Sequence, residues 1–410
     1  MQRNGLTRRE YFKAGLGGAL AASLFGPLEA AEKKPSGLTI TKVETFAVEH
    51  KIPKAIGPSV AMADVRDALL IKISTDSGLV GWGETADVGG TRGIIENHLE
   101  RAVLGKNPLE HRKLWNAMWG PNFADGRAVG GMDIALHDLR GKALGRSIAD
   151  LYGGRVRDRI MGYAAAMNYV EGEDPERTHP AEAAALARKG WRAMKSRTGR
   201  YGFRKDIAVM QKVREAVGPD VRLMTDGNGA FTFPQAVKFG KELEKLDFYW
   251  FEEPMPQAPN YAGYAELARK LNIALAGGEV LDWRGTAREH IVHRSFDIIQ
   301  PDVSLCGGIA EVLFITEMAR LFRMQAAPHC WAGAITIAAT LQVLSLFPPH
   351  FLNSEVGDEP MLEFDVYENP FRDEIVTKKF ELKKGYFDVP TGPGLGIEID
   401  ESVVKKYVTK

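Results

Sequence analysis

The sequence has few cysteines, no net charge and no long apolar run. Only two cysteines, Cys306 and Cys330, occur among 410 residues, so at most one disulfide can form. We expect two buried free thiols, and the sequence leaves open whether they pair. Lys plus Arg and Asp plus Glu both number 53, so the charge favours neither nucleic acid nor an anionic membrane as a partner. No apolar run is long enough for an ordinary transmembrane helix, so we expect no stable membrane span.

The first 31 residues have the pattern of an export signal. The segment TRREYFK at 7–13 contains twin arginines, and it precedes a mildly apolar run over 14–27 and then Ala30 and Ala31. This order resembles a Tat signal peptide that is cleaved near Ala30 or Ala31. The alternative is a short basic N-terminus of a cytoplasmic protein. We expect export through the Tat pathway to a periplasmic or other extracytoplasmic location.

The rest of the chain has the composition of a soluble globular protein. It is 45% hydrophobic and 26% charged overall, which fits a large core. At this length we expect a barrel with a second domain, or two to three ordinary domains.

The first part of this chain predicts an α+β domain over 38–150. Alternating apolar and polar residues over 38–48, 67–75 and 78–84 predict a three-stranded antiparallel meander. The polar segment 50–64 contains Pro and Gly and predicts a long loop, which is either functional or a plain surface loop. Helical spacing of apolar residues predicts helices over 93–103, 109–119 and 131–144.

From residue 158 the pattern changes to strands that alternate with helices. We predict strands over 160–166, 193–197, 223–226, 248–252, 275–279, 298–302, 324–329 and 351–355. Eight strands joined by right-handed crossovers predict a closed parallel barrel with its chemistry at the C-terminal strand ends. The Gly- and Pro-rich tail over 386–396 is expected to return to the first domain.

Three successive predicted strands end in an acid, and these acids are Asp226, Glu252 and Glu279. Because the ends of parallel strands meet at one face of a barrel, we expect the three carboxylates to converge. Three oxygen donors without soft ligands suit Mg²⁺. Each acid alone could instead cap a helix or accept hydrogen bonds in a loop, but three in register favour a magnesium site.

Several short motifs occur along the chain in an order and spacing that are specific to one protein family, although each motif alone is weak. They are GWGE at 81–84, MDIALHDLRGKALG at 132–145, KSR at 195–197, TDGN at 225–228, FEEP at 251–254, GE at 278–279, QPD at 300–302, PH at 328–329 and PGLG at 393–396. On these motifs the chain resembles members of the enolase superfamily, in the mandelate racemase and muconate lactonizing enzyme group. The resemblance implies a modified TIM barrel, (β/α)7β, over 155–360. It also implies an N-terminal α+β capping domain over 38–150, completed by the C-terminal segment 361–410.

The resemblance also assigns the metal ligands. It implies that Asp226, Glu252 and Glu279 bind Mg²⁺, and that Glu253 is a neighbour of the metal site and not a ligand. A glutamate at the third metal position, together with a His-Asp pair, points to the mandelate racemase branch.

The same resemblance implies the acid-base residues. His329 would be the general base, oriented by Asp302, and Glu355 at the end of the predicted eighth strand would donate a hydrogen bond to the bound carboxylate. Removing a proton α to a carboxylate places two negative charges on one ene-diolate, so a cation and a donor must be aimed at its oxygens. A histidine held in one tautomer suits this work near neutral pH. The alternative for His329 is a buried, hydrogen-bonded histidine.

The second barrel strand departs from the common family pattern. Many relatives carry Lys-x-Lys there, whereas this chain has Lys195-Ser196-Arg197. Arginine is not deprotonated in proteins, so Arg197 suits a clamp for a carboxylate or hydroxyl. Lys195 is either an acid-base residue or a source of positive charge near the metal. Racemisation needs two acid-base groups on opposite faces and dehydration needs one, so this strand favours dehydration of an aldonate or aldarate to a 2-keto-3-deoxy acid.

Two alternatives remain open at this point. One is a racemase, epimerase or lactone cycloisomerase in which Lys195 or Arg197 is the second acid-base group. The other is a catalytically inactive exported protein that binds a sugar acid. In each case we expect a small-molecule carboxylate as the partner, no nucleic acid, and a homo-oligomer.

Overall fold

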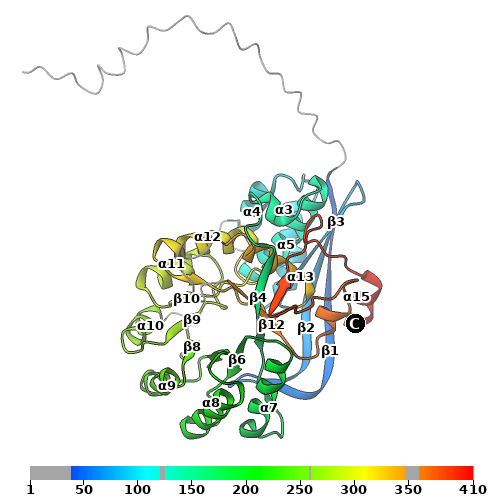
Figure 1. Ribbon diagram of the computed structural model, residues 1–410. Coiled ribbons are helices and arrows are strands. Elements are labelled where there is room, and N and C mark those ends of the chain that lie inside the picture. Colours follow the sequence, from blue (N-terminus) through cyan, green and yellow to red (C-terminus); the bar gives the residue numbers. More distant parts are fainter. Residues whose placement is uncertain (1–37, 121–124, 258–259, 348–359, 410) are drawn as a thin grey trace, which may run out of the picture. The chain divides into compact units, whose positions relative to one another are not determined.

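The computed structural model describes residues 38–120, 125–257, 260–347 and 360–409. The predicted export signal therefore lies outside the described residues. From residue 38 onward, a small antiparallel sheet with its helices lies beside a large parallel sheet (Figure 1). Among the helices so described, none is long and apolar enough to cross a bilayer.

The small sheet confirms the predicted meander. Strands β1 (Ile40–Gly57), β2 (Ala63–Thr75) and β3 (Val80–Thr85) pair antiparallel in the order β3-β2-β1. The short strand β5 (Tyr169–Val170) adds to β1 from the other part of the chain. These strands and the helices that pack on them are called the capping domain below.

The segment 50–64 is not the long loop that the sequence predicted. Strand β1 continues to Gly57 and β2 begins at Ala63, so only 58–62 connect them. The pairing of β1 with β2 is interrupted between Lys51 and Ile56. Pro53 lies in this interruption, where a strand tolerates a residue without an N–H, so the proline was a misleading loop signal.

The helices of the capping domain lie close to the predicted positions. They are α2 (Thr91–Ile94), η1 (Ile95–Leu99), α3 (Glu100–Val103), α4 (His111–Trp119), α5 (Gly126–Leu144) and α6 (Ile148–Leu151). Helix α5 packs directly on β3, and a Cβ atom on Gly83 would overlap the carbonyl oxygen of Gly131. This close approach is the physical reason for glycine in the motif at 81–84.

The large sheet has the eight parallel strands of a barrel. They are β4 (Arg159–Ala165), β6 (Ala193–Arg197), β7 (Arg222–Asp226), β8 (Phe248–Glu252), β9 (Ala274–Gly277), β10 (Ile298–Ile299), β11 (Gln325–Ala326) and β12 (Met361–Asp365), in the order β11-β10-β9-β8-β7-β6-β4-β12. One buried cluster takes a side chain from each strand or its end: Tyr163, Ala193, Met224, Trp250, Ala276, Ile298, Ala327 and Met361. These side chains fill the interior, as in other barrels of this type.

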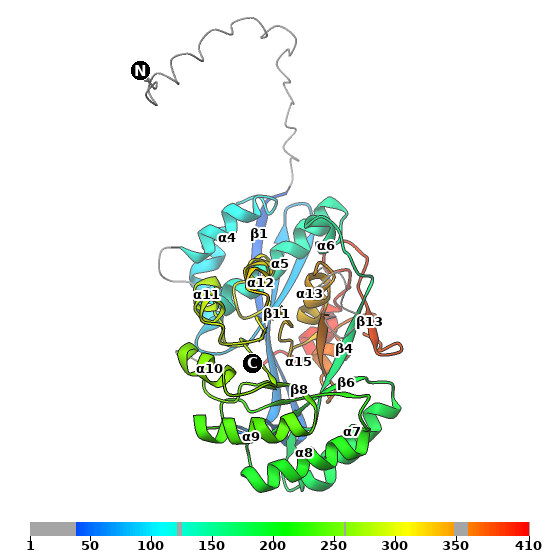
Figure 2. The ribbon, with the colours of Figure 1, turned by 60° about the vertical axis from the view of Figure 1, so that its left-hand side comes forward.

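Seven described helices connect these strands and lie around them (Figure 2). They are α7 (Pro175–Arg188), α8 (Phe203–Val217), α9 (Phe233–Lys245), α10 (Tyr261–Ala268), α11 (Arg284–His293), α12 (Ile309–Leu321) and α13 (Ala334–Leu344). Eight strands and seven connecting helices give the modified TIM barrel, (β/α)7β, that was predicted.

The last barrel strand is not at the predicted place. The predicted strand 351–355, with Glu355, lies outside the described residues. The strand that pairs with β4 is β12, from Met361 to Asp365, so the barrel extends beyond the predicted boundary at residue 360. Both segments are short and end in an acid, which is why their order could not be judged from local pattern alone.

The C-terminal tail contacts both the barrel and the capping domain. It contains α14 (Pro370–Asp373), β13 (Tyr386–Asp388) and α15 (Glu401–Tyr407). Strand β13 pairs with β4 of the barrel, whereas Gly394 bridges to Ser147 and α15 packs near β1. The expected return of the tail to the first domain is therefore correct for its later part.

Hydrogen bonds hold the capping domain against the C-terminal strand ends of the barrel. The Glu84 carboxylate accepts from the backbone N–H groups of Gly333 (2.5 Å) and Thr336 (3.0 Å), at the start of α13. Thr85 donates through its hydroxyl to the carbonyl oxygen of Ser304, after β10 (2.9 Å). The capping sheet thus covers the edge where barrel enzymes place their chemistry.

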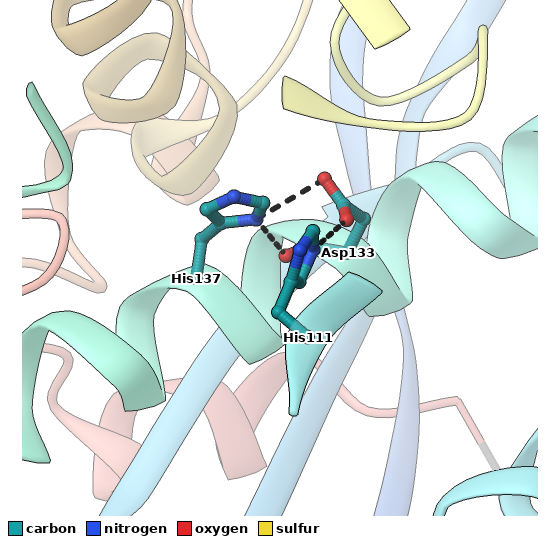
Figure 3. Close-up of side chains that lie close together, drawn as sticks. All are labelled: His111, Asp133 and His137. Atoms are coloured by element: carbon teal, nitrogen blue, oxygen red, sulfur yellow. Dashed lines mark hydrogen bonds and ion pairs between the residues drawn. The ribbon is translucent and has the colours of Figure 1, made fainter. Parts of the chain in front are cut away.

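A buried network on α4 and α5, whose His111, Asp133 and His137 are drawn in Figure 3, is a further link between the two parts. Asp133 Oδ2 accepts from the N–H of Ile309 at the start of α12 (2.8 Å), and Oδ1 lies 2.6 Å from His111 Nε2. His137 Nδ1 lies 2.9 Å from the Asp133 carbonyl oxygen, and its Nε2 lies 2.6 Å from the Tyr152 hydroxyl. Asp133 therefore fixes the start of a barrel helix from within the capping domain.

We expect Asp133→Ala to lower the free energy of unfolding by about 3 to 5 kcal/mol at neutral pH, because the buried partners lose their acceptor. Burial acts to raise the Asp133 pKa, but His137 and His111 hold it well below its ordinary value. A group with a lowered folded-state pKa loses its contribution as the pH falls below its unfolded value of about 4. The difference between variant and wild type in urea denaturation should therefore shrink below that pH. Exposed Asp220 is the matched control, and Asp220→Ala should change stability by less than about 0.5 kcal/mol.

Candidate active site

The described site residues that the sequence predicted come from the ends of six barrel strands, β6 to β11, and meet at one edge. Asp226 and Glu252 are the last residues of β7 and β8, and Glu279 follows β9 by two positions. Their carboxylate oxygens lie within 4.8 Å of one another. The predicted convergence of the three acids is therefore present in the structure.

The three acids differ in burial, and this difference gives the cluster an open side. The side chains of Asp226 and Glu252 are 0% and 1% exposed, whereas that of Glu279 is 24% exposed. Glu252 Oε2 accepts from Trp250 Nε1 and from Gln300 Nε2, each at 2.9 Å. The inner carboxylates are thus fixed by the barrel, and a small molecule can approach them past Glu279.

Lys195 on β6 is surrounded by carboxylates. Its Nζ lies 2.6 Å from Glu252 Oε1, 2.7 Å from Glu363 Oε1 and 3.8 Å from Asp226 Oδ2. Burial alone would lower the Lys195 pKa, but these acids raise it above its ordinary value. Lys195 therefore holds its proton and supplies positive charge, which fits a proton acceptor poorly.

Arg197 on the same strand is also held by acceptors. Its Nη1 pairs with Asp226 Oδ2, and its Nε donates to Asn168 Oδ1 at 3.1 Å. The guanidinium carbon lies 5.3 Å from the centre of the Trp331 ring. Both basic residues of β6 are thus engaged with the acids that would hold a metal.

His329 and Asp302 form a hydrogen-bonded pair at the ends of β11 and β10. His329 Nδ1 lies 2.7 Å from Asp302 Oδ2, and Asp302 Oδ1 accepts from the backbone N–H and hydroxyl of Ser304 (2.7 and 2.6 Å). With Nδ1 donating to Asp302, Nε2 points toward Glu279 Oε2 at 3.4 Å and Glu363 Oε2 at 3.9 Å. The pair has the arrangement of a base and the acid that orients it.

The negative field around His329 decides its protonation. Burial would lower its pKa, but Glu279, Glu363 and the hydrogen bond to Asp302 raise the pKa to about 10. A divalent cation held by Glu279 would offset part of this field. His329 can then act as a base closer to neutral pH.

Glu363 is the functional residue that sequence reasoning missed. It lies on β12, it is fully buried, and it contacts Lys195 and His329. Its pKa falls to about 2 because Lys195 and then His329 outweigh the effect of burial. It lies beside the base, whereas Glu355, which the sequence analysis expected to donate a hydrogen bond to the bound carboxylate, lies outside the described residues. The alternating segment MLEFD at 361–365 was the available signal.

The charges of the site fit a divalent cation. The carboxylates are five, from Asp226, Glu252, Glu279, Asp302 and Glu363, and the cationic side chains are three, from Lys195, Arg197 and His329. Glu253 adds no charge near neutral pH, because burial and then the neighbouring acids raise its pKa to about 10. The acidic side chains outnumber the basic ones at this edge, which favours a cation there. Asp226, Glu252 and Glu279 are the residues that would hold it.

The network of His111, Asp133 and His137 is a poorer candidate for a hard cation. Its possible ligand atoms also lie within 4.8 Å of one another. Two of the three ligands would be imidazole nitrogens, whereas Mg²⁺ prefers oxygen. The contacts within the network (Figure 3), and those to Tyr152 and Ile309, already occupy these groups.

A cavity of about 400 Å³ lies between the capping domain and the site. Its barrel side includes Arg197, Glu279, Asp302, His329 and Trp331. Its capping side comes from β1, β2, the turn between them and the end of β3, and it is mostly apolar apart from Arg66, Asp67, Glu84 and Thr85. This is the size and lining expected of a small-molecule site with a few directed polar groups.

Cys306 and Cys330 are both buried free thiols, as the sequence analysis expected. Burial raises the pKa of each thiol. Neither is therefore a candidate nucleophile.

Comparison with known protein families decides the relationship. The model for the mandelate racemase / muconate lactonizing enzyme N-terminal domain matches residues 41–153, and the model described as enolase C-terminal domain-like matches residues 179–403. The chain belongs to this group of the enolase superfamily. The two matches cover the capping domain and most of the barrel with its tail.

Relatives within the superfamily cover nearly the whole chain. A D-galactarolactone cycloisomerase from Agrobacterium fabrum is 32% identical over 376 residues, which are 90% of this chain and 99% of the relative. An arabinonate dehydratase from Saccharolobus solfataricus is 32% identical over 369 residues, 85% of this chain and 95% of the relative. The crystal structure of a 3,6-anhydro-D-galactonate cycloisomerase from Zobellia galactanivorans has a TM-score of 0.80 at 29% identity, covering 91% of this chain and all of that one.

Proposed function

We propose that this protein removes the proton α to the carboxylate of an acid sugar and expels the β-hydroxyl as water, which gives a 2-keto-3-deoxy acid. The single observation that carries this proposal is the placement of the three basic side chains. His329 Nε2 faces the cavity beside Glu279, whereas Lys195 and Arg197 on β6 are held by carboxylates. One base is enough for an elimination.

The reaction needs negative charge to be stabilised on the substrate carboxylate. We propose Mg²⁺ on Asp226, Glu252 and Glu279, where it would supply a positive charge for those oxygens. Lys195 and Arg197 add positive charge from β6, and Asp302 keeps the His329 ring in one tautomer. After His329 takes the α-proton, the same Nε2–H can protonate the departing hydroxyl. Water leaves, and the enol that remains becomes the 2-keto acid.

The alternative supported by a specific observation is a cycloisomerase. Two relatives described above carry that name, and one of them aligns over 99% of its length. A ring can be opened by the same α-proton removal when the leaving group is a ring oxygen. A racemase is less favoured, because neither β6 residue is available as a second base.

The test is turnover by the mature protein with Mg²⁺ on a panel of aldonates, aldarates and their lactones. We expect at least one open-chain acid to give a 2-keto acid with loss of water. Ring opening without loss of water would favour the cycloisomerase, and binding without any conversion would favour the inactive binding protein.

We also propose export through the Tat pathway, on the sequence of residues 7–13 and 14–31. Replacing both Arg8 and Arg9 by Lys should leave the full-length precursor inside the cell, as fractionation and mass spectrometry would show. Arg3→Lys is the matched control and should leave export unchanged. An exported and processed double variant would remove the Tat assignment and leave the enzyme assignment untouched.

A further inference from the structure

Arg66 is a buried arginine that the capping domain places in the wall of the active-site cavity. It lies on β2, pairs in register with His50 of β1, and is 8% exposed, while its neighbours Val65 and Asp67 are exposed. Among the described residues that line the cavity from the capping domain, it is the only Lys or Arg. The reaction proposed above gives it no role.

Two of the three guanidinium nitrogens of Arg66 have no hydrogen-bond acceptor among the described residues. These two atoms, Nε and Nη2, are both buried. Asp365 Oδ2 lies 2.7 Å from Arg66 Nη2. The geometry of this contact is not that of a hydrogen bond, and Asp365 Oδ2 has no other hydrogen-bond partner among the described residues. The contact therefore balances charge without satisfying the donors, and a buried donor without an acceptor is costly.

Arg66 and Arg197, which lies at the proposed metal end of the cavity, both contact the ring of Trp331. The guanidinium carbons of Arg66 and Arg197 lie 4.9 Å and 5.3 Å from the centre of the Trp331 ring. Arg197 pairs with the metal-site acid Asp226. Two arginines beside one indole ring thus mark two positions in the cavity, one at the metal cluster and one at the wall of the capping domain.

We propose that Arg66 binds a second carboxylate at the far end of the substrate, so the substrate class is the open-chain dicarboxylic sugar acids. This inference rests on the proposed function for the chemistry at the first carboxylate. A guanidinium binds a carboxylate through two parallel N–H···O bonds, which a terminal hydroxymethyl group cannot reproduce. Asp365, which does not line the cavity, anchors the guanidinium from behind. The same wall carries the apolar side chains of Ile52, Ile56 and Met62. Among its described residues Arg66 is the cationic group, and Asp67 and Glu84 are the acidic ones.

The experiment compares matched acids that differ only at the far end. Galactarate and galactonate, and glucarate and gluconate, carry a carboxylate or a hydroxymethyl group at C6 with the same configuration elsewhere. We expect the Mg²⁺-loaded wild type to have the higher kcat/KM for the diacid of the pair that it accepts. Arg66→Met should lose on the order of 100-fold on the diacid, as for a truncated buried charge pair, with a small change on the monoacid.

Further variants separate recognition from folding. Arg66→Lys keeps the charge and loses the planar fork, so it should fall between wild type and Arg66→Met on the diacid. Arg101→Met, on the exposed side of α3, is the matched control and should change neither substrate. An equal loss of Arg66→Met on diacid and monoacid would show a structural role in joining β2 to β12 and would overturn the inference. A wild type with the higher kcat/KM for the monoacid would also overturn the inference.

A binding measurement keeps this inference separate from the proposed function. If the wild type converts no acid of the whole panel and exchanges no α-proton, the proposed function fails. Calorimetric titration of galactarate and galactonate into the Mg²⁺-loaded protein still tests Arg66 in that case. Tighter binding of the diacid that Arg66→Met removes would support the second-carboxylate site, and equal binding of both acids to wild type and variant would overturn it.

Discussion

His329→Asn is expected to lower kcat by at least about 100-fold to 10,000-fold, the range usual for loss of a general base. The loss should lie at the upper end if the same ring also protonates the leaving group. Asparagine cannot take a proton at the position of Nε2, beside Glu279 and Glu363. Steady-state 2-keto acid formation at saturating Mg²⁺ measures the effect.

Two further measurements make the result for His329 specific. Mg²⁺ affinity and the thermal unfolding midpoint of His329→Asn should stay close to the wild-type values, which excludes a loss of fold. Asp302→Asn should have a smaller effect on kcat and should shift its pH profile, because Asp302 acts through the His329 ring. A His329→Asn enzyme within a few-fold of wild-type activity would remove His329 as the base.

Removing the metal, or one of its inner ligands, is expected to abolish activity. Dialysis against a chelator should leave no measurable turnover, and added Mg²⁺ should restore it, because Asp226, Glu252 and Glu279 offer only hard oxygen ligands. Glu252→Gln should weaken Mg²⁺ binding by at least about 100-fold, more than is usual for a residue that only supports a ligand. Titration calorimetry of the metal measures this directly.

Glu253 provides the matched control for Glu252. It is the next residue, and its raised pKa of about 10 leaves it uncharged near neutral pH. Glu253→Gln therefore changes no charge and should keep Mg²⁺ binding. Equal weakening by both substitutions, or metal-free turnover by the wild type, would count against the assigned ligands.

The barrel and its metal-site acids could be predicted because their signals are local. The strands 193–197 and 248–252 are found at the predicted bounds. Each acid directly follows a short apolar run, and the geometry of parallel strands then brings the strand ends together. Asp226, Glu252 and Glu279 converge for this reason, and so do Asp302 and His329.

Two features could not be read in the same way, because they depend on distant parts of the chain. The eighth strand is defined by its pairing with β4, two hundred residues earlier. The sequence around Glu363 therefore gave no stronger strand signal than the sequence around Glu355. Arg66 lies on β2, where apolar and polar residues alternate as in many strands. Only the packing of β2 against the barrel shows that Arg66 faces the cavity. Residues that act across the boundary of two domains need the assembled structure.

The most direct test of the central claim is exchange of the substrate α-proton in deuterium oxide, followed by proton NMR for His329→Asn and Arg197→Met. The central claim is that His329 is the only base and that β6 supplies positive charge. It predicts that His329→Asn loses both α-proton exchange and 2-keto acid formation, while Arg197→Met still exchanges the α-proton at a reduced rate. Exchange by His329→Asn and none by Arg197→Met would contradict it, because a residue of β6 would then be the base.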